Sequence, residues 1–180
     1  MNRFFLILLV TFIATSAFSR DNRPFNDGWL FKKAENLPKT LNETWQPVKI
    51  PHTWNAEDMQ VKKNIFYAGE AYYKKSYTPD KSLSDKRVFL RFEGVAAVAE
   101  VYVNGTLAGN HRGGYSAFVI EMTKLLKYGQ ENEILVKADN ASRPDVIPVN
   151  HTLFGVYGGI YRPVELIVTE KLNIAVTDYA

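Results

Sequence analysis

Short β-rich runs separated by turn residues recur along this chain, at a spacing of roughly ten residues. No segment holds a helical period of apolar residues for three turns, so helices cannot provide the main layers of the fold. Many short strands at this spacing predict an all-β protein, an antiparallel jelly-roll β-sandwich. The predicted strands lie within residues 71–79, 87–94, 99–109, 115–122, 132–139 and 163–170.

Two local signals refine this pattern. Asn104-Gly105 lies between two strand-like runs, and both residue types tolerate the positive φ angles of a type I′ turn, so a β-hairpin is predicted there. One helical turn is predicted from Thr123, as N-cap, to Gly129, which would end it.

The first residues have the pattern of a secretory signal peptide. Met1–Arg3 is positive, Phe4–Ile13 is apolar apart from Thr11, and the small residues Ala17 and Ser19 suit cleavage after residue 19. We therefore expect residues 1–19 to be removed and the protein to be exported, to the periplasm or the extracellular space. A buried N-terminal strand or a membrane anchor is the alternative, although the apolar run is short for a membrane span.

Composition narrows the possible functions. The chain has no cysteine, which excludes thiol catalysis and cysteine-rich metal sites and leaves the core to stabilise the fold. The net charge of +3 comes from scattered basic residues, so no nucleic-acid partner is expected. Residues 20–170 fit one domain. No phosphate-binding loop or dinucleotide fingerprint occurs, so no cofactor is predicted.

No catalytic constellation is visible in the sequence. His52, His111 and His151 have no metal-ligand spacing, so we interpret them as hydrogen-bonded loop residues. Ser116 lacks the G-x-S-x-G frame of a nucleophile. The acids that could form a glycosidase pair are Glu70, Glu93, Glu100, Asp139 and Asp145, but nothing near any of them marks it as a proton donor.

Two glycine clusters remain. The stretch "HRGG" lies within residues 109–114, and it is either a structural corner between strands or a backbone cradle for an anion. No long helix follows it, so we interpret it as a corner. The second cluster, "FGVYGGI", follows a long loop, residues 140–157, of the kind that often binds ligands or another domain. Its predicted substrate-lining residues are Asn150, His151, Thr152 and Tyr157.

Seven segments then occur in a recognisable order. They are "FNDGWLFKK", "WQPVKIPHTWNAEDM", "GEAYYKKSY", "RVFLRFEGVAAVAEVYVNG", "LAGNHRGGYSAFVIEMT", "NEILVKADN" and "YGGIYRPVEL". In this order the chain, from about residue 23 to residue 170, resembles the N-terminal sugar-binding domain of glycoside hydrolase family 2. That family contains β-galactosidases, β-glucuronidases and β-mannosidases, and the resemblance implies a galactose-binding-domain-like jelly roll.

The resemblance also implies partners for this domain. In the family, an immunoglobulin-like domain and a TIM barrel follow, and the barrel carries the acid/base and nucleophile glutamates of a retaining mechanism. We therefore expect residues 171–180 to begin the link into the next domain, and this chain alone to lack catalysis. The alternative for residues 171–180 is a C-terminal strand that pairs back on the sandwich.

One expected residue is missing. Some family members place a carboxylate five residues before the first glycine of the "GGI" motif, where it reaches the sugar in the active site. Leu153 occupies that position here, so galactoside specificity does not carry over; Asn150 or His151 could substitute.

Three functions therefore stay open. The first is the N-terminal domain of an exported, β-galactosidase-like glycosidase, which meets its carbohydrate substrate through the parent enzyme. The second is a freestanding carbohydrate-binding module, with Tyr67, Tyr72 or Tyr157 stacking on sugar rings. The third is a structural adhesion module without a ligand.

Overall fold

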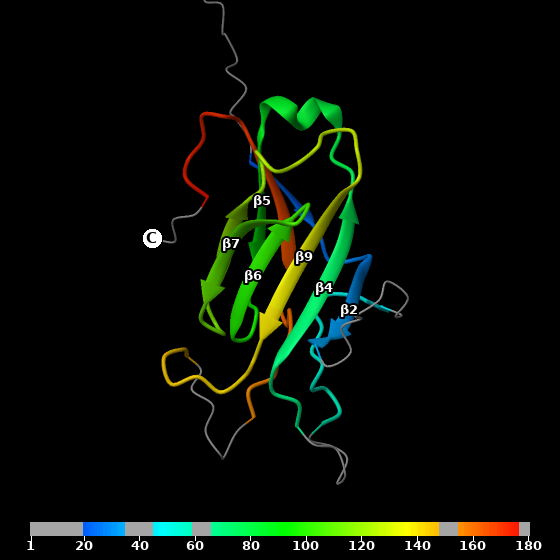
Figure 1. Ribbon diagram of the computed structural model, residues 1–180. Helices are drawn as coiled ribbons and strands as arrows, with labels where there is room; N and C mark the ends of the chain where they lie inside the picture. Colours follow the sequence, from blue (N-terminus) through cyan, green and yellow to red (C-terminus); the bar gives the residue numbers. More distant parts are fainter. Residues whose placement is uncertain (1–19, 35–44, 59–65, 148–154, 177–180) are drawn as a thin grey trace, which may run out of the picture.

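The computed structural model describes residues 20–34, 45–58, 66–147 and 155–176. Two antiparallel sheets face each other, which confirms the predicted jelly-roll sandwich (Figure 1). One sheet has the order β1-β10-β5-β8 and the other the order β3-β2-β4-β9-β6-β7. The elements are β1 (Asp21–Pro24), β2 (Trp29–Lys33), β3 (Gln46–Val48), β4 (Glu70–Tyr77), η2 (Lys81–Asp85), β5 (Arg87–Phe92), β6 (Val98–Val103), β7 (Thr106–Arg112), β8 (Phe118–Glu121), β9 (Asn132–Asp139) and β10 (Val164–Thr169).

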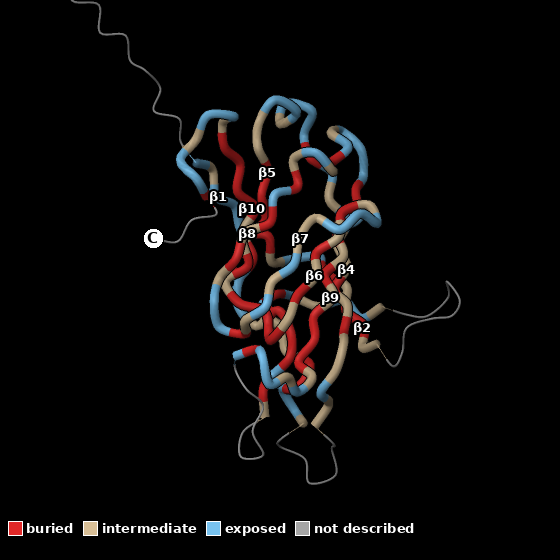
Figure 2. Tube along the Cα trace, turned by 60° about the vertical axis from the view of Figure 1, so that its left-hand side comes forward, coloured by how far each residue is buried: buried red, intermediate tan, exposed pale blue. Residues whose placement is uncertain are grey.

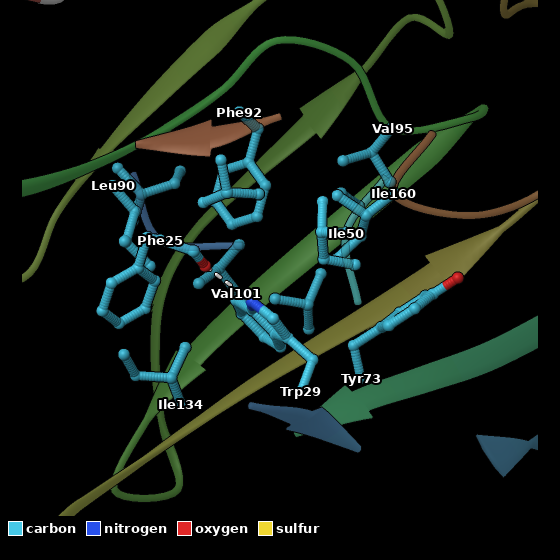
Figure 3. Packing of buried hydrophobic residues seen from close by; sticks show 14 of the residues in the cluster. Phe25, Trp29, Ile50, Tyr73, Leu90, Phe92, Val95, Val101, Ile134 and Ile160 are labelled. Atoms are coloured by element: carbon cyan, nitrogen blue, oxygen red, sulfur yellow. Dashed lines mark hydrogen bonds between the residues drawn. The ribbon is translucent and has the colours of Figure 1, made fainter. Parts of the chain in front are cut away.

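The core lies between the sheets because each strand alternates its apolar residues inward. In β9, Ile134, Val136 and Ala138 are buried, whereas the residues between them face outward. Figure 2 shows this alternation of buried and more exposed residues along the strands. Trp29 and Tyr73 are among the largest fully buried side chains (Figure 3), and each stabilises the fold by roughly 1.5–3 kcal/mol through burial. The indole N–H of Trp29 donates to the carbonyl of Phe25 at 2.8 Å.

The predicted hairpin is confirmed. Asn104 and Gly105 join β6 to β7 with φ angles of 51° and 78°, as a type I′ turn requires. The Asn104 amide also donates to the carbonyl of Leu125 at 2.9 Å and to Oδ1 of Asn132 at 2.8 Å. The turn residue thus ties the hairpin to the next loop as well.

The predicted helical turn is only partly correct. Leu126 N–H donates to the carbonyl of Met122 at 3.2 Å, but the segment forms a turn without a helix. Thr123 does not cap it, because its hydroxyl accepts from the N–H of Val88 at 3.0 Å. Gly129 does end the turn, with φ of 72°. A short 3-10 helix, η2, lies elsewhere and was not predicted.

The "HRGG" stretch is a corner, with one correction to its bounds. Strand β7 continues through Arg112, so only the residues after it cross from the six-stranded to the four-stranded sheet. Gly113 has a φ of 141°, which an L side chain rarely adopts. The ring of His111 stacks on that of Phe118 with centroids 4.3 Å apart, and its Nε2 lies 3.1 Å from the hydroxyl of Ser116.

The segment after β10 is described as far as residue 176 and does not pair with the sandwich as a strand over that length. Residues 171–176 form no strand; Val176 instead packs on Phe89 and Ile167, on the outer face of the four-stranded sheet. Leu172 and Ile174 point away from the sheet and are 85% and 93% exposed. Val176 covers an apolar patch that would otherwise face water, and this burial favours the extended path over strand pairing.

Candidate functional site

The loops of the predicted site gather at the lower end of the sandwich in Figure 1, beyond the end of β9 and the start of β4. Of the four predicted substrate-lining residues, Tyr157 is described and its side chain is 48% exposed. Asn150, His151 and Thr152 lie outside the described residues, as does Leu153. The geometry of the site therefore comes from the segments that lead into and out of residues 148–154.

A buried asparagine organises the exit from that loop. Asn55 is 0% exposed, and its Oδ1 accepts from the N–H of Gly158 at 2.8 Å. Its Nδ2 donates to the carbonyl of Tyr67 at 2.8 Å and to the Asp58 carboxylate at 2.6 Å. One side chain thus joins three segments, and because buried polar groups need partners, the segments are held in one arrangement.

Asn140 completes this cluster from the end of β9. Its Nδ2 donates to the carbonyl of Val156 at 2.7 Å and, at 3.3 Å, to Oδ1 of Asn55. Its Oδ1 accepts from the N–H of Gly69 at 2.8 Å. The two asparagines together fix the backbone that carries Tyr157. No local sequence pattern indicates this pair, since its members lie 85 residues apart.

The second glycine cluster allows close packing against neighbouring segments. A Cβ on Gly158 would lie 1.9 Å from the Trp54 ring, and one on Gly159 would lie 2.4 Å from the carbonyl of His52.

His52 Nδ1 lies 2.7 Å from the Tyr73 hydroxyl. Burial lowers the pKa of His52 and raises the pKa of Tyr73, so both groups stay neutral near pH 7.

The entrance to the loop is held by different contacts. Ala141 N–H donates to Oδ1 of the buried Asp139 at 2.7 Å, and the other oxygen of Asp139 pairs with Arg143. Arg112, from the "HRGG" corner, pairs with Asp145. The corner also donates from Gly114 N–H to the carbonyl of Ile147 at 2.6 Å. Both roots of the loop are therefore anchored to the sandwich.

An apolar pocket of about 320 Å³ lies between these anchored segments. Tyr115 and Tyr157 are exposed at 59% and 48%, and both contribute to its wall. The hydroxyl of Tyr161 donates to the carbonyl of Gly114 and so links the pocket wall to the corner. The remaining lining residues are Thr53, Ala96, Gly155 and Val156. Such a surface offers apolar and aromatic contact and no charged group.

Acid–base chemistry finds no support in the described parts of the chain. Glu70 pairs with Lys137, Glu93 with Arg91, Asp139 with Arg143 and Asp145 with Arg112, while Glu100 accepts a hydrogen bond from Tyr102. His52 makes a hydrogen bond from a loop, as predicted. His111 also makes hydrogen bonds, but it lies in strand β7 and not in the predicted loop. Within residues 20–34, 45–58, 66–147 and 155–176, no three His, Asp or Glu side chains are grouped to hold a metal ion.

The structure is a jelly-roll β-sandwich domain with an apolar pocket between the loops at one end. Comparison with known proteins gives the family: residues 25–170 match the sugar-binding domain of family 2 glycosyl hydrolases, and the chain belongs to that family. The resemblance noted in the sequence is thereby confirmed.

Individual relatives agree with this assignment. A β-glucuronidase from Bacteroides fragilis is 39% identical over 176 residues, which cover 98% of this chain and 24% of that protein. A β-galactosidase from Thermoanaerobacter pseudethanolicus is 34% identical over 86% of this chain and 22% of its own length. The chain thus spans about a quarter of the length of these relatives.

Solved structures show the same domain. A Bacteroides fragilis protein provisionally described as a β-galactosidase has 60% identity and a TM-score of 0.81, over 88% of this chain and 24% of that one. A β-glucuronidase from Bacteroides uniformis has 30% identity and a TM-score of 0.79, over 89% of this chain and 19% of its own. No helix in the described residues is long and apolar enough to cross a membrane.

Proposed function

We propose that this chain is the N-terminal domain of an exported, retaining β-glycosidase of the β-galactosidase and β-glucuronidase type. The immunoglobulin-like domain and the TIM barrel of the same parent chain are its partners, and a β-glycoside is the substrate that the parent hydrolyses. The family assignment and the relatives named above support this proposal. Export rests on the signal-peptide pattern of residues 1–19.

The observation that carries the proposal is the apolar end of the sandwich. Tyr115, Ile147 and Tyr157 are 59%, 71% and 48% exposed, at or beside one pocket. Clustered apolar surface of this kind marks a contact with another protein surface or with a ligand. In the proposed arrangement this end docks on the barrel, and the loop of Asn150, His151, Thr152 and Tyr157 borders the entrance to its active site.

In this mechanism the domain helps to shape the entrance to the active site and takes no part in the bond changes. One barrel carboxylate attacks the anomeric carbon while the other protonates the leaving group, which gives a covalent glycosyl-enzyme ester. Water, deprotonated by the second carboxylate, then displaces the ester, and the two inversions together retain configuration. The domain holds its loop at the entrance through Asn55 and Asn140, whose hydrogen bonds fix the backbone on either side of Tyr157 before substrate arrives.

The test begins with the native locus. Reading the frame beyond the codon for Ala180 shows whether a second sandwich and an α/β barrel follow, and the full product is then assayed with p-nitrophenyl β-glucuronide and β-galactoside. Hydrolysis of either supports the proposal. A stop codon directly after Ala180, or a full product that cleaves neither substrate nor other β-glycosides, overturns it.

A variant of the full product tests the docking role. Tyr157→Ala is expected to raise KM or lower kcat by about tenfold, because an aromatic contact at the entrance contributes roughly 1 kcal/mol or more. Leu107→Ala is the matched control, since Leu107 is 49% exposed on β7 and does not line the pocket. Equal kcat and KM for Tyr157→Ala, Leu107→Ala and the parent would show that Tyr157 does not border the entrance.

A further inference from the structure

A second hollow lies on the outer face of the six-stranded sheet, away from the pocket at the end of the sandwich. Its volume is about 380 Å³, and its walls include Tyr72, Glu100, Tyr102, Glu133 and Lys137. These residues come from β4, β6 and β9, neighbouring strands of the sheet that faces the viewer in Figure 1. No described segment crosses in front of them in that view, so this face of the sheet is open in the described structure.

Tyr72 and Tyr102 lie on the two strands that flank β9, and the strand register determines their spacing. Lys137 lies opposite Tyr72 on one side and opposite Glu100 on the other, whereas Tyr102 lies opposite Leu135. Two strand spacings of about 4.8 Å and a shift of two residues place the Cα atoms of the tyrosines about 12 Å apart across the sheet. Two tyrosines whose Cα atoms have this spacing suit an extended ligand of at least two rings.

Polar groups between the tyrosines are held in place. The Lys137 ammonium lies 2.6 Å from Oε1 of Glu70, and the Tyr102 hydroxyl donates to Glu100. That hydrogen bond to Glu100 is the main cause of the raised pKa of Tyr102, so its phenol stays protonated. Sugar hydroxyls both donate and accept, and fixed carboxylates, an ammonium and phenols can meet them in either role.

This polarity distinguishes the two hollows. The pocket at the end of the sandwich has no charged side chain in its wall, whereas the hollow on the sheet face contains two glutamates and a lysine. Around the sheet-face hollow three carboxylates, Glu70, Glu100 and Glu133, face the ammonium groups of Lys74 and Lys137. Lys32 lies opposite Tyr72 on the neighbouring strand and adds a third ammonium group, so these charges balance. An acidic ligand would add a charge that this balance does not compensate, which disfavours it.

We propose that the outer face of the six-stranded sheet is a second binding site, for a neutral saccharide chain of two or more rings. Tyr72 and Tyr102 stack on the apolar C–H faces of successive sugar rings, and Glu100 and Lys137 bind hydroxyls between them. The site would hold the enzyme on a polysaccharide or glycan while hydrolysis proceeds elsewhere. It does not depend on the proposed glycosidase activity.

The test is an NMR titration of the ¹⁵N-labelled chain with lactose, cellobiose, mannobiose and methyl β-D-glucuronide. At least one neutral disaccharide is expected to shift the amide signals of Tyr72, Glu100, Tyr102 and Lys137 in a saturable way, with a Kd of about 1–10 mM. The glucuronide is expected to bind at least about tenfold more weakly. Shifts confined to Tyr115 and Tyr157, equal binding of the glucuronide, or no saturable shift with any neutral disaccharide would overturn the proposal.

Variants separate binding from folding. Tyr102→Ala is expected to weaken the saccharide about tenfold by removing a stacking ring. Glu100→Gln keeps the shape of the side chain and is expected to weaken binding without changing Tm, so the test survives if Tyr102→Ala fails to fold. Tyr115→Ala, at the other hollow, should leave the affinity unchanged. Normal affinity in both Tyr102→Ala and Glu100→Gln would refute the site, whether or not the parent enzyme hydrolyses glycosides.

Discussion

At the scale of single residues, Asn55 shows why an uncharged amide occupies the centre of a loop cluster. It donates to Asp58 and Tyr67 and accepts from Gly158 in a fully buried position. An aspartate there could not donate, and it would bring a second negative charge beside Asp58. A longer glutamine would have to displace Trp54 or the glycines that pack against it.

Asn55→Ala is expected to lower the free energy of unfolding by about 2–3 kcal/mol, because it leaves buried backbone groups without partners. Urea denaturation measures this loss. Asn110→Ala is the control, since Asn110 is exposed on β7 and its replacement should change stability by less than about 0.5 kcal/mol. Equal losses in the two variants would contradict the role given to the amide.

Two histidines should make stability depend on pH. Burial lowers the pKa of His52 and of His111, so below the ordinary value of 6.5 the unfolded chain binds more protons than the folded one. Their contribution is fully present above about pH 6.5 and is lost as pH falls toward the folded-state pKa values. Urea midpoints should therefore fall between about pH 7.5 and about pH 5.5.

A double variant, His52→Gln with His111→Gln, should flatten that pH dependence. Glu121 does not interfere, because a hydrogen bond from Arg87 lowers the pKa of its carboxyl, so its contribution is lost as pH falls from the ordinary carboxyl pKa toward the lower folded-state value, below the pH window of this test. If the slope is the same in the double variant, the two histidines do not cause it.

At the scale of elements, two variants in the β6–β7 hairpin measure separately the contributions of backbone conformation and of side-chain hydrogen bonds to stability. Gly105 has φ of 78° and open space where a Cβ would stand, so Gly105→Ala tests conformation alone and should cost about 1 kcal/mol. Asn104→Gly keeps the turn but loses three hydrogen bonds, to Leu125, Asn132 and Glu133, and should cost about 1–3 kcal/mol. Thermal unfolding of both variants measures these costs. If Asn104→Gly leaves Tm unchanged, the three side-chain hydrogen bonds do not contribute to stability and the asparagine serves only the turn conformation.

The longer strands could be predicted from the sequence because they alternate or carry a turn signal at one end. The structure places β9 at Asn132–Asp139, within the predicted bounds. Strands β1, β2 and β3 were missed. Strands β1 and β3 have four and three residues and each contains a proline, whereas the five residues of β2 do not alternate between apolar and polar. Thr123 looked like a helix cap, but its hydroxyl found a partner in β5, which no local pattern reveals.

The candidate site was less accessible to sequence reasoning. The long loop with its prolines indicated one end of the sandwich as the candidate site, and Tyr157 lies there, exposed. The cluster of Asn55 and Asn140 depends on contacts between distant segments, and single asparagines in loops carry no such signal. The hollow over β4, β9 and β6 likewise depends on register between three strands.

At the scale of the whole molecule, the exposed apolar side chains lie mainly in two places. Tyr115, Ile147 and Tyr157 are at the loop end, and Leu172 and Ile174 follow β10. Under the proposed function, neighbouring domains cover both. Isolated, the chain would then expose surfaces that favour self-association.

The double variant Leu172→Ser with Ile174→Ser should reduce that self-association without loss of stability, because both side chains are more than 80% exposed. Light scattering at increasing protein concentration measures the association, and Tm checks the fold. Val176→Ser is the contrasting variant: Val176 is 5% exposed on Phe89 and Ile167, so it should lower Tm instead. Unchanged scattering in the double variant would exclude this segment as the associating surface.

The burial of Asn140 has a practical consequence for production of the protein. Asn140-Ala141-Ser142 is an N-glycosylation sequon, and a eukaryotic secretory host attaches the glycan while the chain is still unfolded. The Asn140 side chain is 1% exposed in the fold, and its Nδ2 donates to Val156. A glycan on that nitrogen has no room and removes the donor, so a modified chain cannot close the loop end. Bacterial hosts, or an Ser142→Ala variant in a secretory host, avoid this block.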